Sequence, residues 1–212
     1  MLEVTVIDYG IGNLFSVQRS LEHCGATVTV SADPATILAS SRLVLPGVGA
    51  FGNAMAALAE RNLVAPIREV AASGKPLIGI CLGMQLLLSE SEEFGRTEGL
   101  NLIPGRVVAV PDHDIDGKSL KIPHIGWNAL VPCASEGWLH PLLKDNRAGD
   151  AMYFVHSFMA IPDDPASRLA DCHYGGNAIS AIIGRNNVFG CQFHPEKSGE
   201  SGLRLLKKFC DI

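Results

Sequence analysis

The chain has 212 residues, and 17 Lys and Arg against 22 Asp and Glu give a formal net charge of −5. Apolar residues make up 47% of the chain and charged residues only 18%, which supports a sizeable core and excludes a disordered protein. The mild acidic balance argues against a general nucleic-acid binder, because such a protein needs a basic stripe.

The first half of the chain alternates strand and helix patterns. Apolar and β-branched runs predict strands at residues 4–10, 26–30 and 42–49 and at the start of 76–88. Helical spacing of apolar residues predicts helices at 14–23, 34–40, 53–73 and the end of 76–88, with the third interrupted around Pro66. This order requires a parallel sheet with crossover helices.

The second half has shorter strand patterns and then a final helix. Strands are predicted at residues 105–110, 119–122, 152–155, 167–172, 178–183 and 187–193. Asp116-Gly117 and Gly175-Gly176 are typical hairpin turns, and the amphipathic stretch 198–210 predicts a helix that packs back on the sheet. We expect one α/β domain over residues 1–212. Its predicted form is a three-layer, flavodoxin-like fold with a mostly parallel sheet and an antiparallel extension in the second half.

The sequence disfavours both membrane insertion and secretion. The longest apolar run without charge, residues 43–59, is broken by Pro46 and three glycines, whereas a spanning helix needs about 20 predominantly apolar residues. The first residues carry Glu3 and no basic segment, unlike a signal peptide. None of the six cysteines forms a C-x-x-C pair, which indicates free thiols in a reducing compartment. We therefore expect a cytoplasmic protein that contacts no membrane.

The strongest chemical signal is the sequence G-x-C-x-G at residues 79–83, between a predicted strand and a predicted helix. It is the cysteine form of the nucleophile elbow, a sharp turn that holds the nucleophile in a strained backbone conformation. Residues two before and two after the nucleophile are squeezed together, so glycine fits where a Cβ would clash. We predict that Cys81 is a catalytic nucleophile rather than a buried cysteine in a glycine-flanked turn.

A nucleophilic cysteine also needs a base and a group that orients the base. The sequence His194-Pro195-Glu196 supplies both, because Pro195 keeps His194 extended and side chains at i and i+2 then point to one side. The Glu196 carboxylate would fix the tautomer of His194 and stabilise its protonated ring. The N–H of Leu82, directly after the nucleophile, is one candidate oxyanion donor, and the loop at 46–49 is the candidate source of another.

Two further patterns resemble ligand-binding motifs, but the residues around them do not fit those motifs. Residues 47–52 match the G-x-G-x-x-G dinucleotide fingerprint, but the next predicted strand ends in Cys81 where an acid for the ribose is expected. Residues 112–117 copy half of a calcium-binding loop, but its twelfth position is Pro123 instead of Glu. The remaining histidines lack metal-ligand spacing, so we expect no metal and no other cofactor.

Six motifs resemble the class I, triad-type glutamine amidotransferases, and among them the glutaminase subunit of imidazole glycerol phosphate synthase. They are DYGIGN (8–13), LPGVGAFG (45–52), GICLGMQLL (79–87), PHIGWN (123–128), YFVHSF (153–158) and QFHPEKS (192–198). The elbow and the H-P-E sequence are shared by the superfamily, whereas PHIGWN and HPEKS are far more specific to this subunit. The resemblance therefore spans almost the whole chain.

The resemblance implies a reaction whose substrate is glutamine. The Cys81 thiolate would attack the side-chain amide, and His194 would protonate the departing ammonia and then help water hydrolyse the γ-glutamyl thioester. The oxyanion would be held by the Leu82 N–H and by an amide near Val48.

Other positions match residues that bind glutamine or contact a partner in the family. The glutamine-binding positions are Gly49, Gln85, Glu93 and the main chain around His156 and Ser157. Without the family match, Gln85 and Glu93 would equally well be exposed polar residues on the elbow helix. The interface or gating positions are Asn13, Trp127, Tyr153 and Lys197. The alternative for Trp127 is a core aromatic, although Trp is enriched at interfaces.

The chain is expected to need a partner. Only sixteen residues follow Glu196 and the sequence has no Walker-type phosphate loop, so ammonia can be released but an acceptor site is missing. In the family, a (β/α)₈ cyclase subunit forms a heterodimer with the glutaminase and receives ammonia through an internal channel. That lyase makes imidazole glycerol phosphate and AICAR in histidine biosynthesis. The implied docking face is the carboxyl edge of the sheet around Cys81.

Three other functions stay open from the sequence. A paralogous glutaminase would supply ammonia to an amidotransferase that acts on a surface sugar. A cysteine hydrolase or peptidase of similar fold would act without a partner and without preferring glutamine. A non-catalytic binding module would keep the fold alone, but the intact set of Cys81, His194 and Glu196 argues against it.

Overall fold

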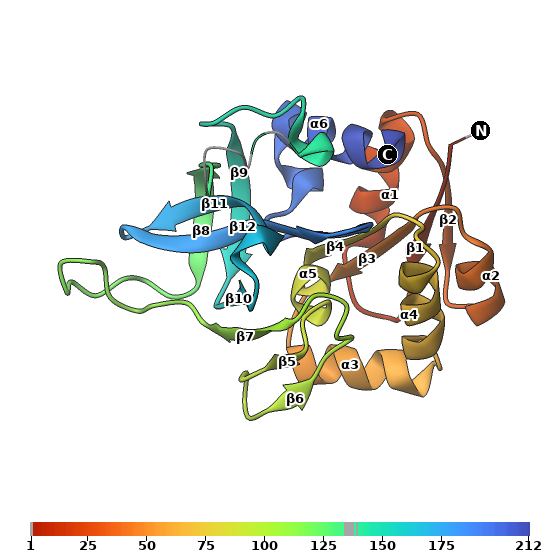
Figure 1. Cartoon of the computed structure of the whole chain (residues 1–212), viewed down its shortest axis with the longest axis horizontal. Coiled ribbons are helices and arrows are strands. Elements are labelled where there is room, and N and C mark those ends of the chain that lie inside the picture. Colours follow the sequence, from red (N-terminus) through yellow and green to blue (C-terminus); the bar gives the residue numbers. More distant parts are fainter. Residues whose placement is uncertain (1, 134–137, 139) are drawn as a thin grey trace.

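The computed structural model describes residues 2–133, 138 and 140–212. Its centre is a seven-stranded sheet with the spatial order β11 (Arg168–Tyr174), β12 (Asn177–Arg185), β13 (Val188–Cys191), β4 (Leu77–Cys81), β3 (Leu43–Gly47), β1 (Glu3–Ile7) and β2 (Thr27–Ser31) (Figure 1). The five strands from β13 to β2 are parallel, and β12 and β11 extend the sheet antiparallel at one edge. This confirms the predicted mostly parallel α/β sheet with an antiparallel extension.

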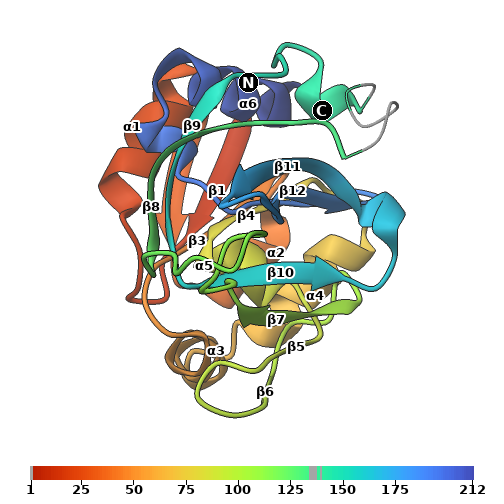
Figure 2. The ribbon, with the colours of Figure 1, turned by 90° about the vertical axis from the view of Figure 1, so that its left-hand side faces the viewer.

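Helices cover both faces of this sheet, as Figures 1 and 2 show. One face carries α1 (Leu14–His23) and α6 (Gly199–Asp211), and the other carries α2 (Pro34–Ala39), α3 (Phe51–Glu60), α4 (Val64–Ala72) and α5 (Leu82–Leu86). Alternate side chains of each strand serve different cores. Val4 and Val6 of β1 join the core of α1 and α6, whereas Ile7 joins the core of the other helices. The sheet and the helices on its two faces therefore form three layers.

Two smaller sheets flank the central one. One has the order β10 (Phe158–Pro162), β7 (Gly105–Ala109), β5 (Glu90–Ser91) and β6 (Thr97–Glu98). The other is an antiparallel ribbon of β8 (His124–Ala129) and β9 (Ala151–His156). Short 3₁₀ turns are η2 (Pro141–Leu143), η3 (Pro165–Ser167) and η4 (Pro195–Lys197). Within the described residues, no helix has both the length and the apolar character needed to cross a membrane.

Several predicted elements were wrong in detail. The helix predicted over 53–73 is interrupted at Asn62, whose φ of +57° is left-handed, and not at Pro66. Pro66 lies in the first turn of α4, where its missing N–H has no helical partner to lose. Residues 119–122 form no strand, and Ser119 makes only an isolated bridge to His113. The ribbon strand β8 was missed because its apolar Ile125 and Trp127 are on the exposed side.

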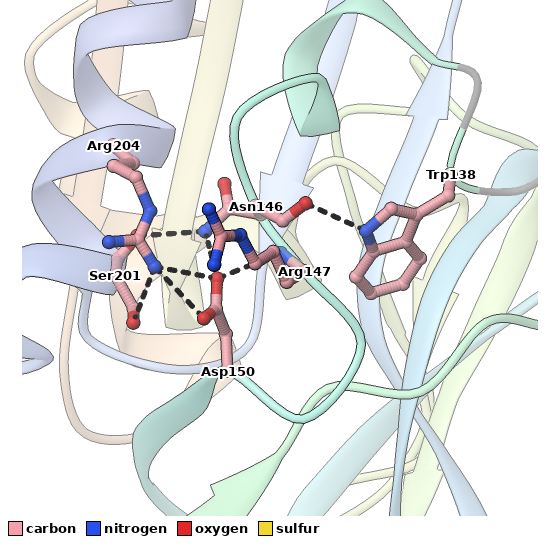
Figure 3. A network of polar contacts seen from close by, with 6 residues as sticks. All are labelled: Trp138, Asn146, Arg147, Asp150, Ser201 and Arg204. Atoms are coloured by element: carbon pink, nitrogen blue, oxygen red, sulfur yellow. Dashed lines mark hydrogen bonds and ion pairs between the residues drawn. The ribbon is translucent and has the colours of Figure 1, made fainter.

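A polar network fixes α6 against the loop before β9 (Figure 3). Arg204 on α6 donates to both carboxylate oxygens of Asp150 at 2.9 Å. Asn146 donates to Asp150 at 3.1 Å and to the carbonyl of Ser201 at 2.9 Å, and the Trp138 indole donates to the carbonyl of Asn146 at 2.8 Å. Because η4 leads directly into α6, this network also holds η4 in place beside β9.

Candidate active site

The sharp turn predicted around Cys81 is present between β4 and α5. Cys81 has φ +56° and ψ −112°, a strained conformation for a residue with a side chain. A Cβ on Gly79 would collide with the backbone of Gly83, and a Cβ on Gly83 would collide with the carbonyl of Leu45 in β3. The two glycines therefore allow the turn to close against the neighbouring strand.

The sheet topology brings His194 to the same edge as Cys81. β13 runs parallel to β4 with Cys191 beside Ile80, so the chain leaves both strands at their common carboxyl edge. The His194 N–H donates to the Tyr153 carbonyl at 2.9 Å. Ser198 Oγ donates to the carbonyl of His194 at 2.6 Å and accepts from the Tyr153 N–H at 3.0 Å. These bonds pin the histidine segment to β9.

His194 and Glu196 form a buried pair. Nδ1 of His194 lies 2.8 Å from Oε1 of Glu196, and the two side chains are only 4% and 1% exposed. Burial lowers the pKa of His194, but hydrogen bonds to Cys81 and Glu196 outweigh it and raise the pKa to about 9. The ring is therefore protonated at neutral pH, and its contact with Glu196 leaves Nε2 for the thiol.

Cys81 and His194 line a cavity of about 410 Å³, a volume that suits a small ligand. The predicted residues that also line it are Asn13, Val48, Gly49, Leu82, Gln85, Glu93, His156, Ser157 and Lys197. Three residues that sequence analysis missed complete the wall: Pro123, Val155 and Phe158. Glu196, Trp127 and Tyr153 do not line the cavity. Among the described residues, no group of three or more His, Cys, Asp or Glu side chains could hold a metal ion.

The loop at residues 46–49 packs tightly against the elbow. The buried hydroxyl of Tyr9 donates to the Pro46 carbonyl at 2.8 Å. A Cβ on Gly47 would lie 2.6 Å from the Tyr9 hydroxyl, so only glycine fits there. Gly49 has φ +91°, and Val48 between the two glycines is 41% exposed at the cavity. The supply of an oxyanion donor from this loop stays a prediction.

Gln85 and Glu93 are not exposed residues of the elbow helix. Gln85 is 5% exposed, and its amide nitrogen donates to the Phe158 carbonyl at 2.9 Å and to Oε1 of Gln192 at 3.0 Å. Glu93 lies beyond α5, after β5, and its Oε2 accepts from the Phe51 N–H at 2.6 Å at the start of α3. The role of Gln192 was missed, although it directly precedes the predicted phenylalanine and histidine of its motif.

Trp127, Tyr153 and Lys197 gather beside the cavity. Trp127 and Tyr153 are opposite each other in the β8–β9 ribbon, with ring centroids 5.9 Å apart. Lys197 Nζ lies 6.0 Å from the centroid of the Tyr153 ring. Trp127 is 60% exposed, so it is not a core aromatic. Contact of this group with a partner stays a prediction.

Two buried histidines near the cavity make the fold sensitive to acid. Burial lowers the pKa of His124 and of His156 to about 4 each. The unfolded chain binds protons at its ordinary histidine pKa of about 6.5, so between pH 6.5 and 4 it binds more protons than the native chain. Stability is therefore present above this window and lost as the pH falls through it.

We expect the free energy of unfolding to fall by roughly 3 kcal/mol or more from these groups between pH 7 and pH 4. Urea unfolding at several pH values measures this loss. A His124→Phe variant should show a shallower pH dependence, whereas His113→Asn, which changes an exposed histidine, should keep that of the wild type. Equal slopes for His124→Phe and the wild type would contradict the assignment.

Comparison with known proteins gives a consistent result over the whole chain. The model of the family "Glutamine amidotransferase class-I" matches residues 5–212. Imidazole glycerol phosphate synthase subunit HisH 1 of Legionella pneumophila (strain Paris) is 53% identical over 213 residues, with 100% of each chain covered. Subunit HisH of Syntrophotalea carbinolica is 46% identical over 210 residues, covering 99% of this chain and 100% of its own.

Solved structures agree in fold. The structure of PurLQS from Thermotoga maritima matches with a TM-score of 0.70 at 19% identity, covering 99% of this chain and 97% of that one. A crystal structure of a glutamine amidotransferase matches with a TM-score of 0.73 at 16% identity, covering 99% of each chain. At such identities the likeness concerns the fold, while the family model and the curated relatives carry the assignment. The chain belongs to the class-I glutamine amidotransferases.

Proposed function

We propose that this chain is the glutaminase subunit of an imidazole glycerol phosphate synthase, acting in histidine biosynthesis. The observation that carries the chemistry is the joint position of Cys81 and His194 on one cavity, with Glu196 directly behind the histidine. The identity of about one half to HisH subunits over their full length supports the pathway. The chain is proposed to work as a single domain over residues 1–212.

The first half of the reaction is acyl transfer to sulfur. The Cys81 thiolate attacks the side-chain amide carbon of glutamine, and the negative charge moves to the amide oxygen. The N–H of Leu82 and an amide near Val48 are proposed to hold this oxyanion. His194, protonated and held by Glu196, gives its proton to the leaving nitrogen, so ammonia departs and a γ-glutamyl thioester remains.

The second half returns the enzyme to its starting state. Neutral His194 takes a proton from a water molecule, whose oxygen attacks the thioester carbonyl. The carbon–sulfur bond breaks, glutamate leaves, and the Cys81 thiolate again faces a protonated His194. The same oxyanion donors serve both halves, because the oxygen stays in one place.

Polar groups in the cavity wall suit the amino-acid part of glutamine. Both amide hydrogens of Gln85 are used by Phe158 and Gln192, which leaves the Gln85 carbonyl oxygen to accept from the substrate. The Glu93 carboxylate, held by the Phe51 N–H, can pair with the α-ammonium group. Gly49 and the main chain of His156 and Ser157 complete the proposed glutamine site.

A cyclase subunit is the proposed partner, in a heterodimer located in the cytoplasm. The carboxyl edge around the cavity carries the exposed apolar side chains Val48, Ile125 and Trp127. Apolar residues exposed beside a cavity are typical of an interaction surface. Asn13, Trp127, Tyr153 and Lys197 are proposed to meet the cyclase, which would receive ammonia through an internal channel. No nucleic acid or membrane enters this proposal.

The decisive experiment measures glutamate release by the pure chain, alone, with the cyclase subunit, and with that subunit plus its nucleotide ligand. We expect low activity alone and a rise of at least about 100-fold in the full mixture, since a few kcal/mol of coupling suffice. A parallel assay follows transfer of the amide nitrogen of ¹⁵N-labelled glutamine into imidazole glycerol phosphate. A chain that hydrolyses glutamine but ignores this cyclase would belong to a different ammonia-consuming pathway.

A further inference from the structure

His124 and His156 form a buried pair behind one wall of the cavity. The two residues are opposite each other in the β8–β9 ribbon, and Nδ1 of His124 lies 2.9 Å from Nε2 of His156. They are only 2% and 6% exposed. His156 lines the cavity, whereas His124 does not. The reaction outlined above gives His124 no role.

The hydrogen bonds of this pair have one direction. The Phe158 carbonyl can only accept, and it lies 2.9 Å from Nδ1 of His156, so that nitrogen carries the proton. A neutral ring has one N–H, so Nε2 of His156 is bare and accepts from the Nδ1–H of His124. Nε2 of His124 is then bare as well, and the amide nitrogen of Asn128 lies 3.4 Å from it. Burial keeps both rings neutral at pH 7, because it lowers the pKa of each to about 4.

The chain of hydrogen bonds ends at the Phe158 carbonyl, which also contacts a second residue of the cavity wall. The Phe158 carbonyl also accepts from Gln85 at 2.9 Å, and Gln85 in turn contacts Gln192 at 3.0 Å. The amide nitrogen of Gln192 lies 3.9 Å from the Cys81 sulfur. The main chain at residues 156–158, where β9 ends and β10 begins, is therefore held from two sides by polar side chains.

The ring of His124 has a fixed position. It stacks between Phe154, at a centroid distance of 5.1 Å, and Tyr174, at 4.2 Å, with interplanar angles of 20° and 25°. The two stacked rings restrict rotation of the imidazole about its Cβ–Cγ bond, because a tilted ring would clash with them. Its Nδ1–H is consequently aimed at His156 and not at solvent.

We propose that His124 is a positioning residue for glutamine. It takes part in a chain of hydrogen bonds in which Asn128 donates to His124, His124 donates to His156, and His156 donates to the Phe158 carbonyl. This chain fixes the main chain at 156–158, which forms one wall of the glutamine site. This inference rests on the proposed glutaminase function. Its consequence is a split in the kinetics, because the wall affects how glutamine binds, while Cys81 and His194, which carry out the chemistry, lie at the ends of β4 and β13.

The kinetic test uses the holoenzyme with its cyclase and a His124→Phe variant, which keeps a stacked ring but loses the donor. We expect the KM for glutamine to rise about tenfold with kcat within about twofold, as for loss of one buried hydrogen bond. His124→Asn should restore most of the affinity, because its amide N–H can replace Nδ1–H. The control His113→Asn, which changes an exposed histidine outside this chain of bonds, should leave KM unchanged.

A second measurement reads the direction of the bonds without any variant. In ¹⁵N-histidine-labelled wild-type protein at pH 7, two-bond proton–nitrogen spectra should show both buried rings as neutral Nδ1–H tautomers. A ring protonated at Nε2 would overturn the proposal, and so would an active His124→Phe enzyme with the KM of the wild type. A wild type that hydrolyses no glutamine with any partner would refute the proposed function, whereas the tautomers would still decide the hydrogen-bonded chain.

Discussion

A Cys81→Ala variant is expected to lose glutamine hydrolysis by at least about 10⁴-fold, while it folds and binds its partner as the wild type does. The reason is chemical, because no thioester can form without the sulfur. The backbone at this position, with φ +56°, is strained for cysteine and alanine alike, so the substitution changes the nucleophile and not the turn. Glutamate release in the presence of the cyclase and its nucleotide ligand measures the loss.

Cys24 provides a matched control for this experiment. It follows α1 at the end opposite the site, its Sγ contacts the Leu203 carbonyl at 3.5 Å, and burial raises the pKa of its thiol. Cys24→Ala should therefore keep activity. A glutamine-like alkylating agent should add to the wild type and to Cys24→Ala, but not to Cys81→Ala, by intact mass. Activity of Cys81→Ala within tenfold of the wild type would disprove the nucleophile assignment.

The parts of the site that sequence analysis predicted are those set by short-range rules. The spacing of Gly79 and Gly83 around Cys81 is a steric requirement of one turn, and it can be read from five residues. The pairing of His194 with Glu196 was predicted from an extended backbone, but only His194 is extended: Pro195 begins the 3₁₀ turn η4, and this turn brings Glu196 to the His194 ring. The parallel pairing of β13 with β4 brings the ends of both strands to one edge. The alternation of strands and helices in the first half did not imply this pairing, because β13 belongs to the second half, where an antiparallel extension was predicted.

The parts that were missed depend on pairings between distant segments. Gln85 meets Gln192 across 107 positions of the chain, and His124 meets His156 only because β8 and β9 pair in one register. No local pattern encodes either contact. β8 was also difficult to predict because its apolar side chains lie on the exposed face. A half-buried strand usually places its apolar side chains on the buried face.

The helix break at Asn62 is a further feature that the local sequence pattern did not predict. The sequence predicts an interruption of residues 53–73 around Pro66, since proline in the interior of a helix kinks or breaks it. The first turn of a helix tolerates proline, and Pro66 lies there because α4 starts only two residues earlier. The helix is in fact interrupted at Asn62, which has a left-handed backbone conformation. Asn adopts this conformation more readily than most residues, but the presence of an Asn alone does not predict it.

Gly83→Ala is expected to cost about 3–5 kcal/mol of stability or to prevent folding. The added Cβ would collide with the carbonyl of Leu45, which belongs to β3, an inner strand of the seven-stranded sheet. β3 pairs with both β1 and β4, so its backbone cannot retreat without loss of sheet hydrogen bonds. Any relief must instead open the turn, which would move Cys81 away from His194.

Gly52→Ala is the matched control, because its Cβ would meet only Thr97 Oγ1 at 3.7 Å, an ordinary contact. Gly52 lies in the first turn of α3, so alanine should leave stability unchanged or raise it by about 0.5–1 kcal/mol through helix propensity. Urea unfolding and glutamate release on both variants separate the two cases. Gly83 has an ordinary helical backbone rather than a left-handed one, so space alone decides its outcome. A Gly83→Ala protein with wild-type stability and activity would mean that the close approach of α5 to β3 is not needed to form the elbow.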